Sequence, residues 1–155
     1  MARLEDFDEL DRHIVEHLCA SSKGSYRQVA KDLGVHPTTL IQRVKTLEEK
    51  GVIRGYRANV DLSAMGFEYS GLIYIIASDV QGVMDELLTI PRVVSVMDVT
   101  GEADCVVWIT CVDHDEFTRT VKTINSLEGV VRANTSVILN TVKDPYDFVP
   151  KLRST

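Results

Sequence analysis

The chain has 155 residues and a mass of 17.3 kDa, a size that suits one or two small domains rather than one large one. Its net charge of −6 argues against a nucleic-acid partner for the chain as a whole, but the charge is unevenly distributed. Residues 23–57 carry eight basic and three acidic side chains, whereas residues 61–155 carry seven basic and fourteen acidic ones. Positive charge is therefore concentrated in one segment, as binding to a polyanion requires.

No part of the sequence has the pattern of a signal peptide, and no apolar run approaches the ~18–20 residues of a membrane span. We therefore expect a soluble, cytoplasmic protein. Cys19, Cys105 and Cys111 lack C-x-x-C spacing, so they are interpreted as small buried apolar residues. His13 and His17 lie one helical turn apart near Cys19, which is formally a metal-ligand spacing, but no further ligand is evident. We expect a solvated or partly packed histidine pair, with no metal and no other cofactor.

The first predicted element is a helix that has Asp8 as its N-cap and ends near Ala20. Leu10, Ile14 and Leu18 recur at helical spacing and form its inward face. This helix completes a three-helix unit with the two helices that follow.

A second helix is predicted to begin at Tyr26. Ser25 is a favourable N-cap, and Gln28 completes a capping box in which its side chain returns a hydrogen bond to the cap backbone. The helix ends at Gly34, which tolerates the left-handed conformation common after a helix. Its inward face contains Val29, Ala30 and Leu33.

A third helix follows after a short turn, with His36 as its N-cap and Pro37 at its first position. Gly51 ends it. The inward stripe consists of Leu40, Val44 and Leu47, whereas the outward positions are Thr38, Thr39, Gln42, Arg43 and Lys45. This succession of a capped helix, a tight turn and a second helix is typical of a helix-turn-helix.

The outward face of the third helix has the side chains that read DNA. A helix fits the major groove, where Gln42 can bind adenine through two hydrogen bonds and threonine offers a hydroxyl and a methyl group. Arg43 or Lys45 can neutralise a phosphate or bind guanine. Residues 52–60 are expected to form a short wing-like extended segment, from which Arg54 and Arg57 could contact phosphates. The predicted DNA-contacting residues are Ser25, Tyr26, His36, Thr38, Thr39, Gln42, Arg43, Lys45 and Arg54. Alternatively, these polar side chains are only solvated.

The pattern of the chain changes from helical period to strand period after a hinge at residues 61–68. The predicted order beyond it is strand 71–78, helix 80–90, strands 93–100 and 105–112, a helix from 114 to about 128, and strand 130–142. Asp113 caps the last helix, and Glu116 completes a capping box. This βαββαβ order predicts an α+β chain with a ferredoxin-like fold in its second half. The expected domains are a winged-helix-like helix-turn-helix at 1–60, the hinge at 61–68, the ferredoxin-like domain at 69–143 and an irregular tail at 144–155.

Both faces of the predicted sheet are apolar. Ile73 and Ile75 alternate with Leu72, Tyr74 and Ile76, and the strand at 105–112 shows the same property. Two helices can cover only one face, so the other face is expected to pack against a second copy of the chain. A dimer also presents two recognition helices about 34 Å apart to a pseudo-palindromic DNA site. A monomer with an exposed apolar sheet is the alternative.

Several segments together resemble the leucine-responsive regulator family, Lrp/AsnC. They are Leu10-Asp11 with Ile14 and Leu18, Val29-Ala30 to Gly34-Val35, Thr39, Arg43-Val44, Leu47-Glu48, Gly51-Val52-Ile53 and Val99-Thr100-Gly101 with Asp104. The resemblance covers roughly residues 5–143. It implies a DNA-binding domain linked to a ligand-sensing ferredoxin-like domain, in dimers that often assemble into tetramers or octamers and control transcription. It also implies an amino-acid effector held between neighbouring sensing domains.

The resemblance places an effector pocket near Gly101, Asp104 and Thr135, where the Gly101 amides can bind a carboxylate and Asp104 an ammonium group. The chain departs from the family at two nearby positions, since Ala103 replaces a common aromatic residue and Ala133 a common threonine. His36 replaces the usual serine at the helix cap. Gly101 and Asp104 are also ordinary turn residues, so an altered or empty pocket stays an alternative.

Two other functional classes stay open. Some tetrapyrrole-modifying decarboxylases resemble this two-domain arrangement, and His114, Tyr74 or His36 could serve such a site. The sequence, however, has no nucleophile beside a general base, no suggestive pair of carboxylates and no glycine-rich phosphate loop, so we expect no enzyme and no catalytic residue. The other class is an architectural protein that wraps DNA with little sequence preference.

Overall fold

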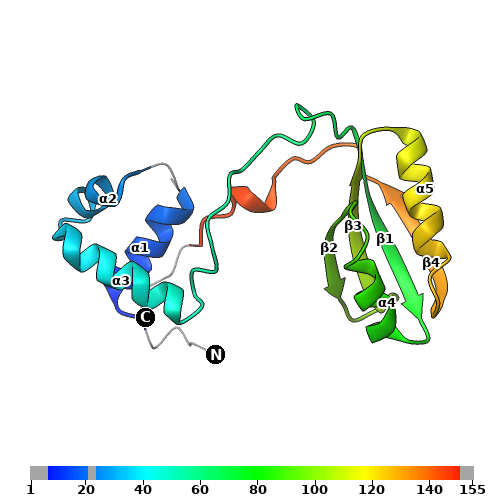
Figure 1. Ribbon diagram of the computed structural model, residues 1–155, viewed down its shortest axis with the longest axis horizontal. Coiled ribbons are helices and arrows are strands. Elements are labelled where there is room, and N and C mark those ends of the chain that lie inside the picture. The colour runs from blue at the N-terminus through cyan, green and yellow to red at the C-terminus, as the bar shows by residue number, and fades with distance from the viewer. Residues whose placement is uncertain (1–6, 21–23, 151–155) are drawn as a thin grey trace. The chain divides into compact units, whose positions relative to one another are not determined.

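The computed structural model describes residues 7–20 and 24–150 and divides the chain into two compact units (Figure 1). The first unit extends to Asn59 and also includes the segment from Lys143 onward, and the second extends from Val60 to Val142. The sequence-based division treated residues 144–155 as a separate, irregular tail. Of these residues the structure describes 144–150, which cluster with the first unit and contain a short 3-10 helix, Pro145–Asp147, capped by Asp144.

Three helices form most of the first unit: α1 (Glu9–Ala20), α2 (Tyr26–Asp32) and α3 (Pro37–Glu49). The turn between α2 and α3 depends on Gly34, which has a φ of 66°. The Gly34 amide donates to the Lys31 carbonyl and the Val35 amide donates to the Ala30 carbonyl, at 3.2 and 2.9 Å. These two hydrogen bonds end α2, so the predicted helix end at Gly34 is confirmed. One small core joins the three helices, and its buried residues are Ile14, Val29, Ala30, Leu40, Val44 and Leu47.

The segment at residues 52–60, expected to be extended and wing-like, follows α3. It contains neither helix nor strand, and the described residues of the first unit include no strand that could pair with its backbone. Asp61 then organises a turn, since its Oδ1 accepts hydrogen bonds from the amides of Ser63 and Ala64 at 2.9 and 3.1 Å.

The second unit contains one antiparallel sheet with strand order β2-β3-β1-β4. Its elements are β1 (Tyr69–Ala77), α4 (Val80–Leu87), β2 (Val93–Asp98), β3 (Cys105–Cys111), α5 (His114–Asn125) and β4 (Val130–Val137). The βαββαβ order and the ferredoxin-like fold are confirmed. The last strand ends at Val137 rather than at residue 142. Among the described strands it pairs with β1 alone, which begins at Tyr69, so the pairing stops once the Ile138 amide donates to the Ser70 carbonyl.

The core of the second unit lies between one face of the sheet and the two helices. Ile73 and Ile75 of β1, together with Val107 and Ile109 of β3, are completely buried there. At Gly71 an added Cβ would lie 2.9 Å from the Phe117 ring, so only glycine lets α5 approach β1 this closely. The opposite face of the sheet is not covered by any helix of the chain's described part.

The cysteine prediction is only partly right. Cys105 and Cys111 are completely buried, and burial raises the pKa of both thiols. Cys19 is exposed, because it lies in the last turn of α1 beyond the inward-facing Leu18.

The capping boxes predicted for Gln28 and Glu116 do not form, because neither side chain bonds to the backbone of its N-cap residue. The Gln28 amide group donates to Asp32 Oδ1 at 2.7 Å, although Ser25 Oγ does accept from the Gln28 backbone amide. Glu116 Oε2 accepts from the Val112 amide at 2.9 Å, one residue before the N-cap, and its Oε1 accepts from Arg92 Nε at 2.7 Å. In both cases another partner competes successfully for the side chain.

Candidate nucleic-acid interface and effector site

The N-terminus of α3 is built as the sequence predicted. His36 is the N-cap, and its Nδ1 accepts a hydrogen bond from the Thr38 amide at 3.3 Å. This bond requires an unprotonated Nδ1, so the ring proton of the neutral histidine lies on Nε2. Pro37 occupies the first helical position, where its missing N–H costs nothing.

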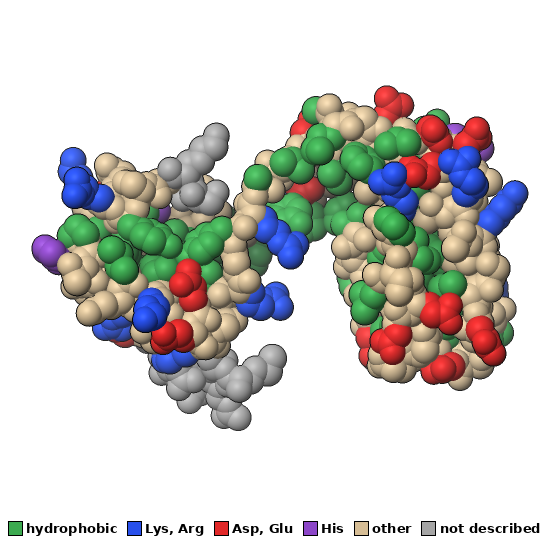
Figure 2. Space-filling model, viewed as in Figure 1, with side chains coloured by type: hydrophobic (Ala, Val, Ile, Leu, Met, Phe, Trp, Pro, Cys, Tyr) green, Lys and Arg blue, Asp and Glu red, His purple; other side chains and the backbone are tan. Residues whose placement is uncertain are grey.

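Thr38, Thr39 and Gln42 form an exposed polar face on the N-terminal half of α3. Positions three and four apart on a helix are neighbours, so these side chains lie close together. The opposite side of α3 buries Leu40 and Val44. Figure 2 shows Lys and Arg side chains distributed around the helical unit on the face in view. The arrangement gives a polar helix surface within a cationic segment, which is what a duplex-binding element needs.

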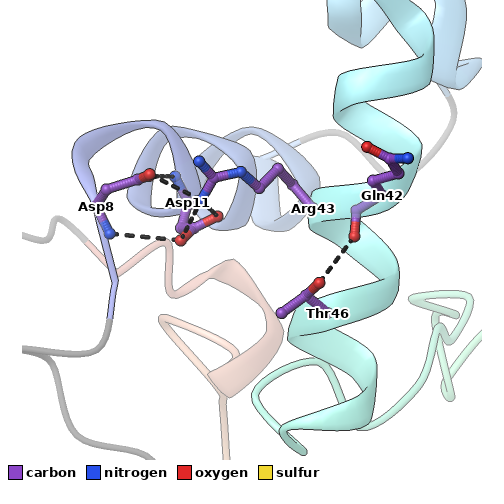
Figure 3. A network of polar contacts seen from close by, with 5 residues as sticks. All are labelled: Asp8, Asp11, Gln42, Arg43 and Thr46. Atoms are coloured by element: carbon purple, nitrogen blue, oxygen red, sulfur yellow. Dashed lines mark hydrogen bonds and ion pairs between the residues drawn. The ribbon is translucent and has the colours of Figure 1, made fainter.

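Arg43 does not share that face. Its Nη1 lies 2.7 Å from Asp8 Oδ2 and 3.2 Å from Asp11 Oδ2, so the side chain turns toward α1 (Figure 3). The Gln42 side chain points away from this network in the same view. The structure therefore separates Arg43 from the other outward residues with which the sequence had grouped it.

Ser25 and Tyr26 both lie on the surface at the start of α2. The Tyr26 hydroxyl lies 3.1 Å from the Tyr56 hydroxyl, which donates to Glu48 Oε1 at 2.8 Å. Burial and these two hydrogen bonds raise the pKa of Tyr56. Residue Tyr56, in the segment after α3, thus connects the beginning of α2 with the end of α3.

The remaining predicted cations are exposed. Lys45 forms an ion pair of 3.7 Å with Glu49, one turn further along α3. Arg54, in the segment after α3, lines a concave region of about 790 Å³ with Tyr146 and Phe148. Sequence reasoning did not select Arg27 and Lys31, two exposed cations on α2. Their signal was available, because both contribute to the basic segment 23–57.

The predicted effector residues are not together within one chain. Gly101 is exposed with a φ of 128°, and the Asp104 carboxylate accepts a hydrogen bond from the Ala77 amide at 2.8 Å. Thr135 pairs with Ile73 and belongs to the helix-covered side of the sheet. There it lines a cavity of about 400 Å³ whose other walls include Tyr69, His114, Phe117, Val121 and Lys122.

The loop at residues 99–103 borders a different concave region, on the uncovered sheet face. This region has a volume of about 890 Å³ and is lined by Tyr74, Ile76 and Val106 on the central strands. Its β4 side is polar, with Arg132, Asn134 and Ser136. The uncovered face is therefore apolar at its centre and polar at one edge.

Two parts of the chain match known domain families. Residues 7–54 match the winged helix-turn-helix DNA-binding family, and residues 73–148 match the Lrp/AsnC ligand binding domain. An uncharacterized HTH-type transcriptional regulator of Pyrococcus horikoshii is 35% identical over 147 residues, covering 94% of this chain and 99% of the relative. The chain belongs to the Lrp/AsnC family. This Lrp/AsnC protein is a helix-turn-helix transcriptional regulator that binds DNA.

Other members of the family agree in sequence and in fold. The HTH-type transcriptional regulator FL11 of Pyrococcus furiosus is 31% identical, over 93% of this chain and 97% of that protein. The feast or famine regulatory protein from M. tuberculosis, complexed with L-methionine, has a TM-score of 0.85 and 26% identity, covering 92% of this chain and 99% of that one. E. coli AsnC shares the fold, with a TM-score of 0.78 at 24% identity over 96% and 97% of the two chains.

Two further observations concern the part of this Lrp/AsnC chain that the structure describes. None of the helices within residues 7–20 and 24–150 has the length and apolar character to span a bilayer. Within the same residues, no three His, Cys, Asp or Glu side chains converge as metal ligands would. His17 is engaged by Asp32, whose Oδ2 lies 3.2 Å from the His17 Nε2.

Proposed function

We propose that this regulator reads duplex DNA with the N-terminal half of α3 in the major groove. The observation that carries the proposal is the exposed face formed by Thr38, Thr39 and Gln42, beside a buried apolar stripe on the same helix. Gln42 has the geometry to bind adenine and the threonines can contact thymine methyl groups. Ser25 and Tyr26 lie at the N-terminus of α2, and His36 lies at the N-terminus of α3. These three residues, together with Lys45 and Arg54, are proposed to contact the sugar-phosphate backbone.

The test uses duplexes that the protein recovers from a random-sequence library by in vitro selection. Gln42→Ala should relax specificity at one base pair and weaken binding by about 1–3 kcal/mol, because a bidentate base contact is lost. Gln81→Ala removes an amide of the same size from α4 in the second unit, where Gln81 bonds to Asp85, and should leave affinity unchanged. Equal affinity of the wild-type protein for selected and random duplexes would instead favour an architectural protein.

The proposal includes a homodimer formed through the uncovered sheet face. The apolar centre of that face supports a second copy as its cover, since an exposed apolar patch of this kind usually marks an interface. A two-fold axis would place two α3 helices for successive major grooves, about 34 Å apart. Higher assembly into a tetramer or octamer is part of the same proposal and is read by sedimentation.

We further propose an amino acid as the effector. The relative from M. tuberculosis binds L-methionine, and the cavity beside Thr135 has the apolar walls and nearby Lys122 that an amino acid's side chain and carboxylate would use. Gly101 and Asp104 would come from a neighbouring subunit, since one chain does not bring them to Thr135. Titration calorimetry with the twenty amino acids tests this. Thr135→Val should weaken binding of the amino acid. Thr89→Val is the control and should leave binding unchanged, because the Thr89 hydroxyl donates to the Glu86 carbonyl near the end of α4.

The assignment includes no catalytic residue, and the site of action is the compartment that holds DNA, which for this family we propose to be the cytoplasm. Uptake of a tetrapyrrole by a purified protein that fails to bind any duplex would favour the decarboxylase alternative.

A further inference from the structure

Arg43 is held by α1 through two carboxylates at once. Nη1 lies within 2.7 Å of Asp8 Oδ2 and within 3.2 and 3.3 Å of the two Asp11 oxygens. The Asp11 side chain is only 10% exposed, whereas Arg43 is 40% exposed. One guanidinium nitrogen therefore serves three acceptor oxygens at the N-terminal end of α1, two of them from Asp11, which lies 32 residues earlier in the chain.

The two carboxylates are themselves fixed. Asp8 Oδ1 accepts from the Asp11 amide at 2.9 Å, and Asp11 Oδ2 accepts from the Asp8 amide at 3.4 Å. This reciprocal cap, with the Arg43 charge beside it, lowers the pKa of Asp8. Both carboxylates face the N-terminus of α1, where the helix dipole favours negative charge. They form a rigid acceptor rather than a mobile surface pair.

We infer that Arg43 is a positioning residue, which fixes the angle of α3 against α1 and does not itself contact DNA. The inference rests on the proposed reading of DNA by α3. Arg43 is the seventh residue of α3, one residue after Gln42, so its anchor lies next to the residues that meet the bases. All three contacts are made by one nitrogen, Nη1, at the end of a side chain long enough to reach both carboxylates from α3. A lysine ammonium also carries its donors on one nitrogen, so lysine at this position should keep part of the anchor.

The first experiment compares Arg43→Ala with Lys45→Ala, a matched loss of one cation on the same helix. Lys45 is 73% exposed and is proposed to meet a phosphate. Lys45→Ala should reduce the slope of log affinity against log salt by about one unit. Arg43→Ala should keep that slope, yet lower the affinity for the selected duplex about fivefold to thirtyfold. The loss should affect discrimination at every base pair of the site rather than at one. Arg43→Lys should restore only part of this loss.

The second experiment removes the anchor and keeps the arginine. Asp8→Asn with Asp11→Asn makes the unit more positive by two charges and frees the guanidinium. If Arg43 positions α3, the ratio of specific to random-duplex affinity falls. If Arg43 is a DNA contact held in reserve, binding to both duplexes tightens and the ratio is maintained. The two roles thus predict opposite outcomes for the same variant.

Three results would overturn the inference: loss of one slope unit by Arg43→Ala, loss of discrimination at a single base pair, or unchanged affinity. A measurement made without DNA distinguishes failure of this inference from failure of the proposed DNA-reading function. Amide hydrogen exchange in α3 of the free protein should accelerate in Arg43→Ala and not in Lys45→Ala. If the wild-type protein lacks specific binding, that exchange still decides whether Arg43 anchors α3. If Arg43→Ala does not fold, the asparagine pair decides.

Discussion

Replacement of Trp108 by glutamate should separate the proposed dimer. Trp108 lies on β3 between Leu72 of β1 and Ser95 of β2, at the centre of the uncovered sheet face. Tyr74, Ile76 and Met97 are 39, 36 and 41% exposed in the single chain. Complete burial of such a side chain is worth about 1.5–3 kcal/mol, so covering the exposed fraction contributes about 0.6–1.2 kcal/mol each.

These three side chains from each subunit, six in all, would supply about 4–7 kcal/mol, within the ~4–15 kcal/mol range lost on association. Because the proposed dimer is two-fold symmetric, one substitution places two glutamates in the interface. Each unpaired carboxylate costs several kcal/mol to desolvate in an apolar interface. Even about 4 kcal/mol in total raises the dissociation constant roughly a thousandfold.

Sedimentation velocity over a dilution series measures this change directly. Trp108 is also the only tryptophan of the chain, so its emission spectrum reports dissociation of the wild-type protein without a label. Leu88→Glu is the matched control, because Leu88 is 73% exposed at the end of α4, away from the uncovered face. An intact dimer of the Trp108→Glu protein at micromolar concentration would refute the reasoning.

Two carboxylates should contribute to stability in measurable ways. Asp104→Ala should lower the free energy of unfolding by about 1–3 kcal/mol, measured in urea, because the Ala77 amide loses its acceptor; Asp104→Asn, which keeps an acceptor oxygen, should cost less. If instead both variants unfold like the wild type, the bond contributes nothing. The Val112 amide and then Arg92 lower the pKa of Glu116 from its ordinary 4.5. Its contribution is therefore complete above that value and lost as the pH falls through the lowered pKa, so urea midpoints of the wild type and Glu116→Gln should converge in acid; a constant difference would contradict this.

Local features of the fold could be predicted from the sequence because they depend on neighbouring residues. The N-cap at Ser25, the proline at position 37 and the glycine after α2 act within one turn of helix, and each was found where expected. The buried stripe of α3 follows from helical spacing alone.

Partner choice over longer distances could not be predicted in the same way. Arg43 has an outward position by spacing, but its flexible side chain reaches two carboxylates whose location depends on how α1 packs. The Gln28 side chain likewise bonds to Asp32, and the Glu116 side chain to Val112 and Arg92, partners that a capping pattern does not identify. The separation of Thr135 from Gly101 depends on sheet register and on the face to which each side chain points. Sequence spacing therefore placed residues on elements and left open what their side chains meet.

The discontinuous first unit has a mechanical consequence. The chain leaves that unit before Val60 and returns to it after Val142, so the sensing unit is connected to the DNA-binding unit by two covalent tethers. Both tethers depart from one corner of the sheet, because the start of β1 and the end of β4 are paired there, with Gly71 opposite Val137. Two tethers from one corner resist swivelling more than a single tether does.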